Sequence, residues 1–101
     1  MGVEVTRIEL ERALEDRCVA KIEARGGLAL KLSIPGARGF PDRTCLLGGR
    51  TFFIEVKRIK TGVVSKQQHR WRALLFQAGF NTYFVSTDAE FDEALAKEMV
   101  R

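Results

Sequence analysis

Apolar residues near the start of the chain recur at the spacing of an amphipathic helix. Every fourth residue from Leu10 to Ile22 is apolar, and charged residues lie on the other faces. This spacing places the apolar side chains on one side of a helix. The pair Gly26-Gly27 follows, and glycine commonly ends a helix because it adopts left-handed backbone angles. We therefore expect a long helix over residues 4–25.

Short apolar runs separated by glycine and proline predict strands in the middle of the chain. Residues 28–34 form the first expected strand, and a loop follows at 35–42, where two glycines and two prolines exclude regular structure. Residues 43–47 and 51–57 form two further strands, joined by a tight turn at Gly48-Gly49. A hairpin is therefore expected directly after the loop.

The last third of the chain predicts a helix, a strand and a helix. Ser65 begins the first of these helices, because Gln68 three residues later completes a capping box, and Gly79 ends it. A strand over 81–86 and a helix over 88–101 follow. The side chains expected to be buried are Trp71, Leu74, Leu75 and Ala78 in the first helix, and Phe91, Leu95 and Met99 in the second.

The order of these elements predicts the fold class. One helix, three strands, a helix, a strand and a final helix favour an α/β fold, in which helices flank a mixed four-stranded sheet. The chain has 101 residues, of which 46% are hydrophobic and 30% charged. That size and composition suit a single domain over residues 1–101 with one buried core.

Composition also narrows the class of protein. No apolar run approaches the roughly 20 residues of a membrane-spanning helix, and the first residues lack the pattern of a signal peptide. We therefore expect an intracellular, cytoplasmic protein with no membrane partner. Cys18 and Cys45 have no CxxC spacing, and His69 is the one histidine of the sequence. A zinc site or a disulfide scaffold is excluded on these grounds.

The positive charge is concentrated in the middle of the chain. Residues 26–75 carry ten basic and two acidic residues, whereas both flanking segments are net acidic. A basic block of this kind is typical of proteins that bind a polyanion, because each neutralised phosphate releases counterions. A solvated basic surface that only aids solubility is the alternative.

The two acidic residues of the basic block, Asp42 and Glu55, do not fit a plain phosphate-binding surface. A carboxylate repels phosphate unless a cation lies between them. Two carboxylates at such a surface therefore suggest a hard divalent ion. Ordinary ion pairs with neighbouring arginine or lysine are the alternative interpretation.

The hairpin is expected to bring these two acids together. Strand side chains alternate between faces, so Phe53, Glu55 and Lys57 share one face. Asp42 directly precedes the neighbouring strand. The two carboxylates and the carbonyl oxygen of Val56 would form an open, oxygen-rich site suited to Mg²⁺ or Mn²⁺. Lys57 would orient the nucleophile or stabilise developing negative charge.

These residues resemble a known nuclease signature. Pro41-Asp42 and Glu55-Val56-Lys57 are similar to the PD-(D/E)XK motif, and the wider strings 39–43, 53–57 and 65–67, followed by Trp71, resemble the VRR-NUC (virus-type replication-repair nuclease) branch of that superfamily. The resemblance implies a restriction-endonuclease-like core and metal-dependent hydrolysis of phosphodiester bonds. It also implies a homodimer like the Holliday junction resolvases, a viral, bacterial or mobile-element origin, and no nucleotide cofactor.

The resemblance assigns roles to individual residues. It makes Asp42 and Glu55 the metal-binding acids, Lys57 the catalytic lysine and Gln67 the glutamine of the motif. The branch also has a glutamate in its first helix that reaches the metal. The glutamates that match this one are Glu9, Glu11 and Glu15, with Glu15 preferred for its place beside Leu14 and Glu11 the second choice.

The sequence therefore predicts a Mg²⁺- or Mn²⁺-dependent DNA endonuclease that acts on branched or Holliday-junction-like DNA. The alternative is a nucleic-acid-binding module that keeps the fold without turnover. His69 is expected at the surface, either as an ordinary surface residue or as a DNA contact. The basic residues expected to grip phosphates are Arg38, Arg43, Arg58, Lys60, Lys66 and Arg70.

Overall fold

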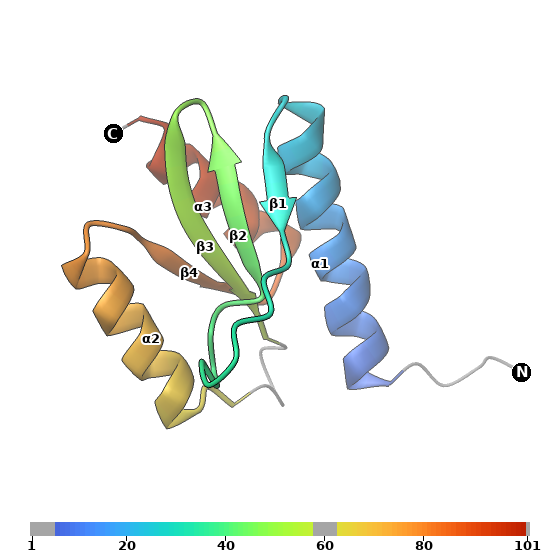
Figure 1. Ribbon diagram of the computed structural model, residues 1–101. Coiled ribbons are helices and arrows are strands. Elements are labelled where there is room, and N and C mark those ends of the chain that lie inside the picture. The colour runs from blue at the N-terminus through green and yellow to red at the C-terminus, as the bar shows by residue number, and fades with distance from the viewer. Residues whose placement is uncertain (1–5, 58–62, 101) are drawn as a thin grey trace, which may run out of the picture.

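A four-stranded mixed sheet lies at the centre of the molecule, with its strands in the spatial order β1-β2-β3-β4 (Figure 1). The computed structural model describes residues 6–57 and 63–100. Strands β1, β2 and β3 pair in antiparallel fashion, and β4 runs parallel to β3. The strands are β1 (Leu28–Leu30), β2 (Arg43–Leu47), β3 (Arg50–Val56) and β4 (Thr82–Val85).

Three helices complete the described part of the fold. Helix α1 (Arg7–Ala24) and helix α3 (Asp88–Met99) cover one face of the sheet, and α2 (Lys66–Gln77) lies on the other side (Figure 1). Thr6, Ser65 and Thr87 cap the three helices, because each side chain accepts a hydrogen bond from a backbone N–H of the first turn. The element order is the predicted one, and the α/β fold class is confirmed. None of these helices, within the described residues, is long and apolar enough to cross a membrane.

The main core lies between the sheet and the helix pair α1 and α3. The side chains predicted to face inward from α1 and α3 are buried there, except that Leu10 and Met99 are only half-buried. Strand β3 presents alternate residues to this core, as its period of two requires. The buried cluster includes Cys18, Ile22, Phe52, Ile54, Phe91 and Leu95. Both cysteines are buried and unbridged.

Helix α2 departs from the predicted packing. None of its residues is buried, so the expected buried stripe from Trp71 to Ala78 is wrong. The helix instead rests on a small aromatic layer, in which the Phe40 ring lies 5.6 Å from that of Phe53 and 5.2 Å from that of Trp71. Apolar periodicity shows which side of a helix is apolar. It does not show how much of the sheet surface is free to pack against that side of the helix.

Some strand boundaries also differ from the sequence prediction. Strand β1 ends at Leu30 rather than at residue 34, and Leu32 and Ile34 are exposed. The hairpin turn at Gly48-Gly49 forms as expected, and both glycines have positive φ angles of 58° and 77°. The register of this hairpin pairs Arg43 with Ile54. Asp42, which precedes Arg43, therefore meets Glu55, which follows Ile54, at the open end of the hairpin.

Candidate nuclease-type active site

Asp42 and Glu55 meet at that end of the hairpin and hold each other in place. The backbone N–H of Asp42 donates to Oε1 of Glu55 over 3.1 Å. In return, the backbone N–H of Val56 donates to Oδ2 of Asp42 over 2.8 Å. Because both contacts use backbone groups of paired strands, the register of the hairpin fixes the position of both carboxylates. The predicted meeting of the two acids is therefore present in the structure.

Both carboxyl groups are in an environment that disfavours negative charge. Burial raises the pKa of Glu55 to about 8, and the neighbouring Asp42 charge raises it as well. Burial also raises the pKa of Asp42, and the nearby Glu15 charge adds to this effect. Lys57 acts in the opposite direction on both groups, so its ammonium lies close enough to favour their charged forms. A cation that binds beside the two carboxyl groups would therefore stabilise their charged forms.

Gln68 belongs to the site, although its spacing from Ser65 predicted only a role in capping α2. Its Nε2 donates to Oε2 of Glu55 over 2.7 Å. Its Oε1 accepts from the backbone N–H of Ser65 over 2.8 Å, as the capping box requires. The cap therefore fixes which end of the amide faces Glu55. The capping-box spacing of Ser65 and Gln68 is therefore the sequence signal that could have indicated Gln68 as a site residue.

Gln67, the glutamine assigned from the family motif, occupies a different position. Its side chain is exposed at the start of α2. Its backbone packs against Gly39, where an added Cβ would come within 2.7 Å of the Gln67 carbonyl carbon. Gly39 also has a positive φ of 84°. In this structure the residue that contacts Glu55 is thus Gln68, and a site role for Gln67 stays a prediction.

Glu15, the preferred first-helix glutamate, is buried near Asp42 but already has partners. Its Oε2 accepts from Nε of Arg43 over 2.7 Å and lies 3.4 Å from Nζ of Lys31. Arg43 also donates to the carbonyl oxygen of Ala29 over 3.1 Å. Arg43 therefore links α1, β1 and β2 through its side chain. This structural role differs from the predicted one, in which Arg43 binds phosphate.

The donor set suits a divalent cation in part. Asp42 and Glu55 supply carboxylate oxygens, the hard ligands that Mg²⁺ and Mn²⁺ prefer. Among the described residues, however, no three His, Cys, Asp or Glu side chains are grouped closely enough to hold a metal. Glu15 and the half-buried Glu11 are accordingly not gathered with the pair, and their metal roles stay predictions. The fit therefore rests on Asp42, Glu55 and a backbone carbonyl such as that of Val56.

Comparisons with known proteins agree with this arrangement. No family model matches the chain. A curated relative named "Putative nuclease p44", from Acyrthosiphon pisum secondary endosymbiont phage 1, is 38% identical over 52 residues, which are 50% of this chain. The match spans 56% of that relative's length. A solved structure named "VRR_NUC domain" superimposes with a TM-score of 0.78 at 28% identity, covering 86% of this chain and 95% of that one.

The chain has the fold of a VRR-NUC domain. The structural match extends over most of the chain. The resemblance inferred from the residues is therefore confirmed by this match and by the similarity to the phage relative.

The basic residues predicted to grip phosphates differ in their surroundings. Three of them are exposed: Arg38, Lys66 and Arg70. The backbone carbonyl oxygen of Arg38 accepts a hydrogen bond from Nε1 of Trp71 over 3.0 Å. Arg58 and Lys60 lie outside the described residues. His69 is exposed, as expected, and its ring lies 5.7 Å from that of Phe84.

Proposed function

We propose that this domain is a metal-dependent DNA endonuclease that hydrolyses phosphodiester bonds. The observation that carries the proposal is the pair of carboxylates formed by the half-buried Asp42 and the buried Glu55. Reciprocal backbone hydrogen bonds hold this pair, and Lys57 lies close by. The cost of placing two partly desolvated acids beside each other is explained if a cation and a phosphate occupy the site during the reaction. The name of the phage relative and the VRR-NUC fold support the same activity.

Asp42, Glu55 and the carbonyl oxygen of Val56 are the groups that would hold Mg²⁺ or Mn²⁺. When bound, such an ion polarises a phosphoryl group and lowers the pKa of a water molecule. Lys57 follows Val56 at the end of β3, where its ammonium acts on both carboxylates. It would orient the attacking water and stabilise the charge that develops on the phosphate.

Two contacts keep this site in shape before substrate binds. The amide of Gln68 holds Oε2 of Glu55 from the side of α2. The ion pair of Arg43 with Glu15 connects α1 to the start of β2, directly beside Asp42. Pre-organised side chains lower the reorganisation that the transition state requires.

The substrate class that fits best is branched or otherwise structured DNA, cut by a homodimer. The domain is small, and a duplex needs more positive surface than the few exposed basic residues near one site. A two-fold dimer would present two sites to the two sides of a symmetric junction. Both points also follow from the family resemblance given above.

The alternative is a nucleic-acid-binding module without turnover. It is favoured by the absence of a three-residue acidic cluster among the described residues. Asp42, Glu55 and Lys57 argue against it, because binding of a phosphate alone does not require two adjacent carboxylates at the binding surface.

The test is cleavage of a labelled panel that includes a four-way junction, a flap, a splayed arm, a linear duplex and a single strand. Each substrate is incubated with Mg²⁺, Mn²⁺ or EDTA, with the native protein and the variants Lys57→Ala and Glu55→Gln. Metal-dependent cutting that both substitutions abolish supports the nuclease. Tight binding without cutting under either metal supports the binding module instead.

A further inference from the structure

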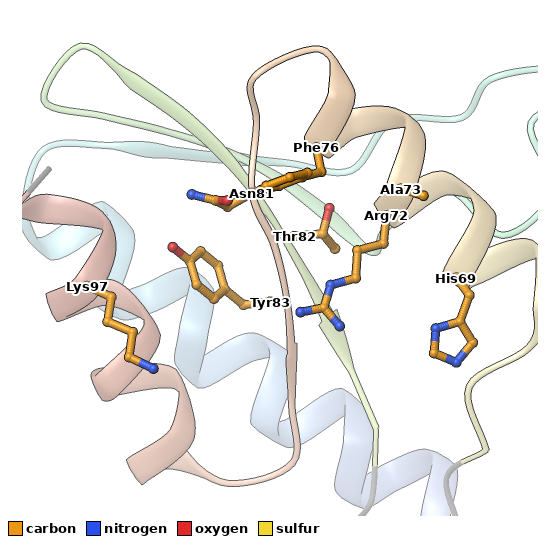
Figure 2. Close-up of a pocket in the computed structure, with 8 residues that line it drawn as sticks. All are labelled: His69, Arg72, Ala73, Phe76, Asn81, Thr82, Tyr83 and Lys97. Atoms are coloured by element: carbon orange, nitrogen blue, oxygen red, sulfur yellow. The ribbon is translucent and has the colours of Figure 1, made fainter.

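A groove opens beside the edge strand β4, between α2 and α3 (Figure 2). It lies on the side of β4 opposite to β3, the strand that carries Glu55. Its volume is about 550 Å³, within the range of small-molecule and nucleotide sites. Arg72 and Phe76 enter it from α2, Lys97 from α3, and Thr82 and Tyr83 from β4 (Figure 2). None of the uses described above explains this set of residues.

Thr82 provides evidence that the groove takes a polar ligand. Its side chain is only 3% exposed, and its Oγ1 has no hydrogen-bond partner among the described residues. A buried hydroxyl without a partner is costly, and a ligand donor or acceptor would remove the cost once a shift of the groove wall exposes Oγ1. Thr44 has a similar unpaired hydroxyl but does not line the groove.

The charges of the groove indicate an anion. Arg72 and Lys97 lie on its two walls, and among the described residues no acidic side chain lines it. The guanidinium of Arg72 is held 4.8 Å from the centre of the Phe84 ring, over the edge strand. The neighbouring hollow along α3 shares Arg72, Tyr83 and Lys97 with the groove and is also lined by Glu90 and Glu93, which would repel a phosphate. An anion is therefore favoured inside the groove, on the side of Arg72 and Lys97 away from these two acids.

The apolar part of the groove suits a flat ring. Phe76 is 69% exposed, an unusual state for so large an apolar side chain. Tyr83 lies opposite, and its hydroxyl donates to Oε1 of Glu98 over 2.7 Å, which fixes the orientation of its ring. Aromatic faces of this kind stack with nucleobases. A nucleotide of DNA has both a flat ring and an anionic group.

Residues in contact with one another connect the wall of the groove to the acid pair. His69, which also lines the groove, directly follows Gln68, the residue that contacts Glu55. Its ring packs on Phe84, and Phe84 pairs with Glu55 across β3 and β4. A DNA strand that leaves the acid pair along α2 would therefore enter the groove.

From these observations we propose that the groove between α2 and α3 binds one unpaired nucleotide of the DNA substrate, with its base against Phe76 and Tyr83 and its phosphate at Arg72 and Lys97. The proposal rests on the proposed nuclease function and adds a substrate class to it. DNA with unpaired nucleotides, such as a flap or a splayed arm, is preferred over a blunt duplex.

The test measures binding without cleavage. The probe is 5′-phosphorylated, dye-labelled dT tetranucleotide in EDTA, followed by fluorescence anisotropy, with thymidine and inorganic phosphate as separate competitors. The variants are Phe76→Ala and Arg72→Gln, both at exposed positions. The matched controls are Ile8→Ala and Arg12→Gln, which are exposed on α1. We expect each groove variant to weaken binding by about tenfold and each control to leave it unchanged.

The outcomes separate this inference from the nuclease proposal. Equal binding of the probe by the native protein and all four variants overturns the inference, even if the protein cuts DNA. Loss of binding in the groove variants supports it, even if no DNA is cut. If inorganic phosphate competes fully while Phe76→Ala has no effect, the site is for anions alone and the inference is overturned. It is also overturned if Phe76→Ala abolishes a dimer without changing the affinity for the probe.

Discussion

Gln68 and Glu55 are joined by a 2.7 Å hydrogen bond from the first turn of α2 to the end of β3. The same glutamine closes the capping box of α2 through its other amide atom. The start of the helix and the position of the buried acid therefore depend on one side chain. A change at this residue is expected to affect the chemistry and the helix end together.

Gln68→Ala is predicted to lower the rate of DNA cleavage by about tenfold to one-hundredfold, because Glu55 loses the donor that orients it. Gln77→Ala, at an exposed glutamine at the end of α2, is the matched control and should retain most activity. The measurement is the single-turnover rate with Mn²⁺ for both variants, beside their melting temperatures. Equal losses in the two variants would mean that the hydrogen bond to Glu55 is unimportant for the reaction.

The metal-free protein is predicted to become less stable as the pH rises from about 5 to 8. The folded-state pKa of Glu55, about 8, lies above its ordinary value, so the folded state holds a proton that the unfolded state has lost. Folding free energy is therefore lost across this window, and the raised pKa of Asp42 acts in the same direction.

Glu55→Gln is predicted to remove most of this dependence and to raise the melting temperature at pH 8 by about 5 °C. The measurement is thermal unfolding in EDTA at several pH values, for the native protein and the variant. A native melting temperature that rises between pH 5 and 8, in parallel with that of the variant, would contradict the pKa assignment.

Divalent ions are predicted to restore stability at high pH, since a cation between Asp42 and Glu55 offsets their repulsion. An ion at one hundred times its dissociation constant stabilises the folded state by about 2.7 kcal/mol. Mn²⁺ should therefore raise the melting temperature of the native protein at pH 8 and leave Asp42→Asn nearly unchanged. A shift of the same size in both proteins would place the ion elsewhere.

Glu15→Gln is predicted to reduce stability by about 3 kcal/mol, because it leaves the half-buried Arg43 without its charged partner. Since Arg43 already occupies Oε2 of Glu15, we expect the affinity for Mn²⁺ to change by less than about threefold. Chemical denaturation and calorimetry measure the two quantities separately. A tenfold loss of Mn²⁺ affinity at unchanged stability would instead make Glu15 a metal ligand, as the family resemblance implies.

The sequence predicted the acid pair because strand geometry is regular. A period of two and a two-glycine turn determine the register of β2 and β3, and that register alone brings Asp42 to Glu55. The partners of the pair could not be predicted in the same way. Neighbouring residues on a helix point about 100° apart, so the choice between Gln67 and Gln68 depends on where α2 lies against the sheet.

Two other differences have the same origin. The ion pair of Arg43 and Glu15 joins residues 28 positions apart, and charge patterns along the chain do not identify such partners. Of the side chains expected to be buried along α2, Trp71 and Leu75 are half-buried, whereas Leu74 and Ala78 are exposed. Only the folded sheet shows that Phe40, Phe53 and Phe80 already cover the facing surface. The exposed Phe76 and the groove beside β4 follow from this arrangement.

The central claim is that Asp42, Glu55 and Lys57 form a site that breaks phosphodiester bonds. Its most direct test is the single-turnover cleavage of an end-labelled splayed arm with Mn²⁺, by the native protein and by Lys57→Ala at matched fold and DNA affinity. We expect cutting that EDTA stops and a rate at least about one-hundredfold lower in the variant. Equal rates in the two proteins, or no cutting by the native protein with either metal, would contradict it.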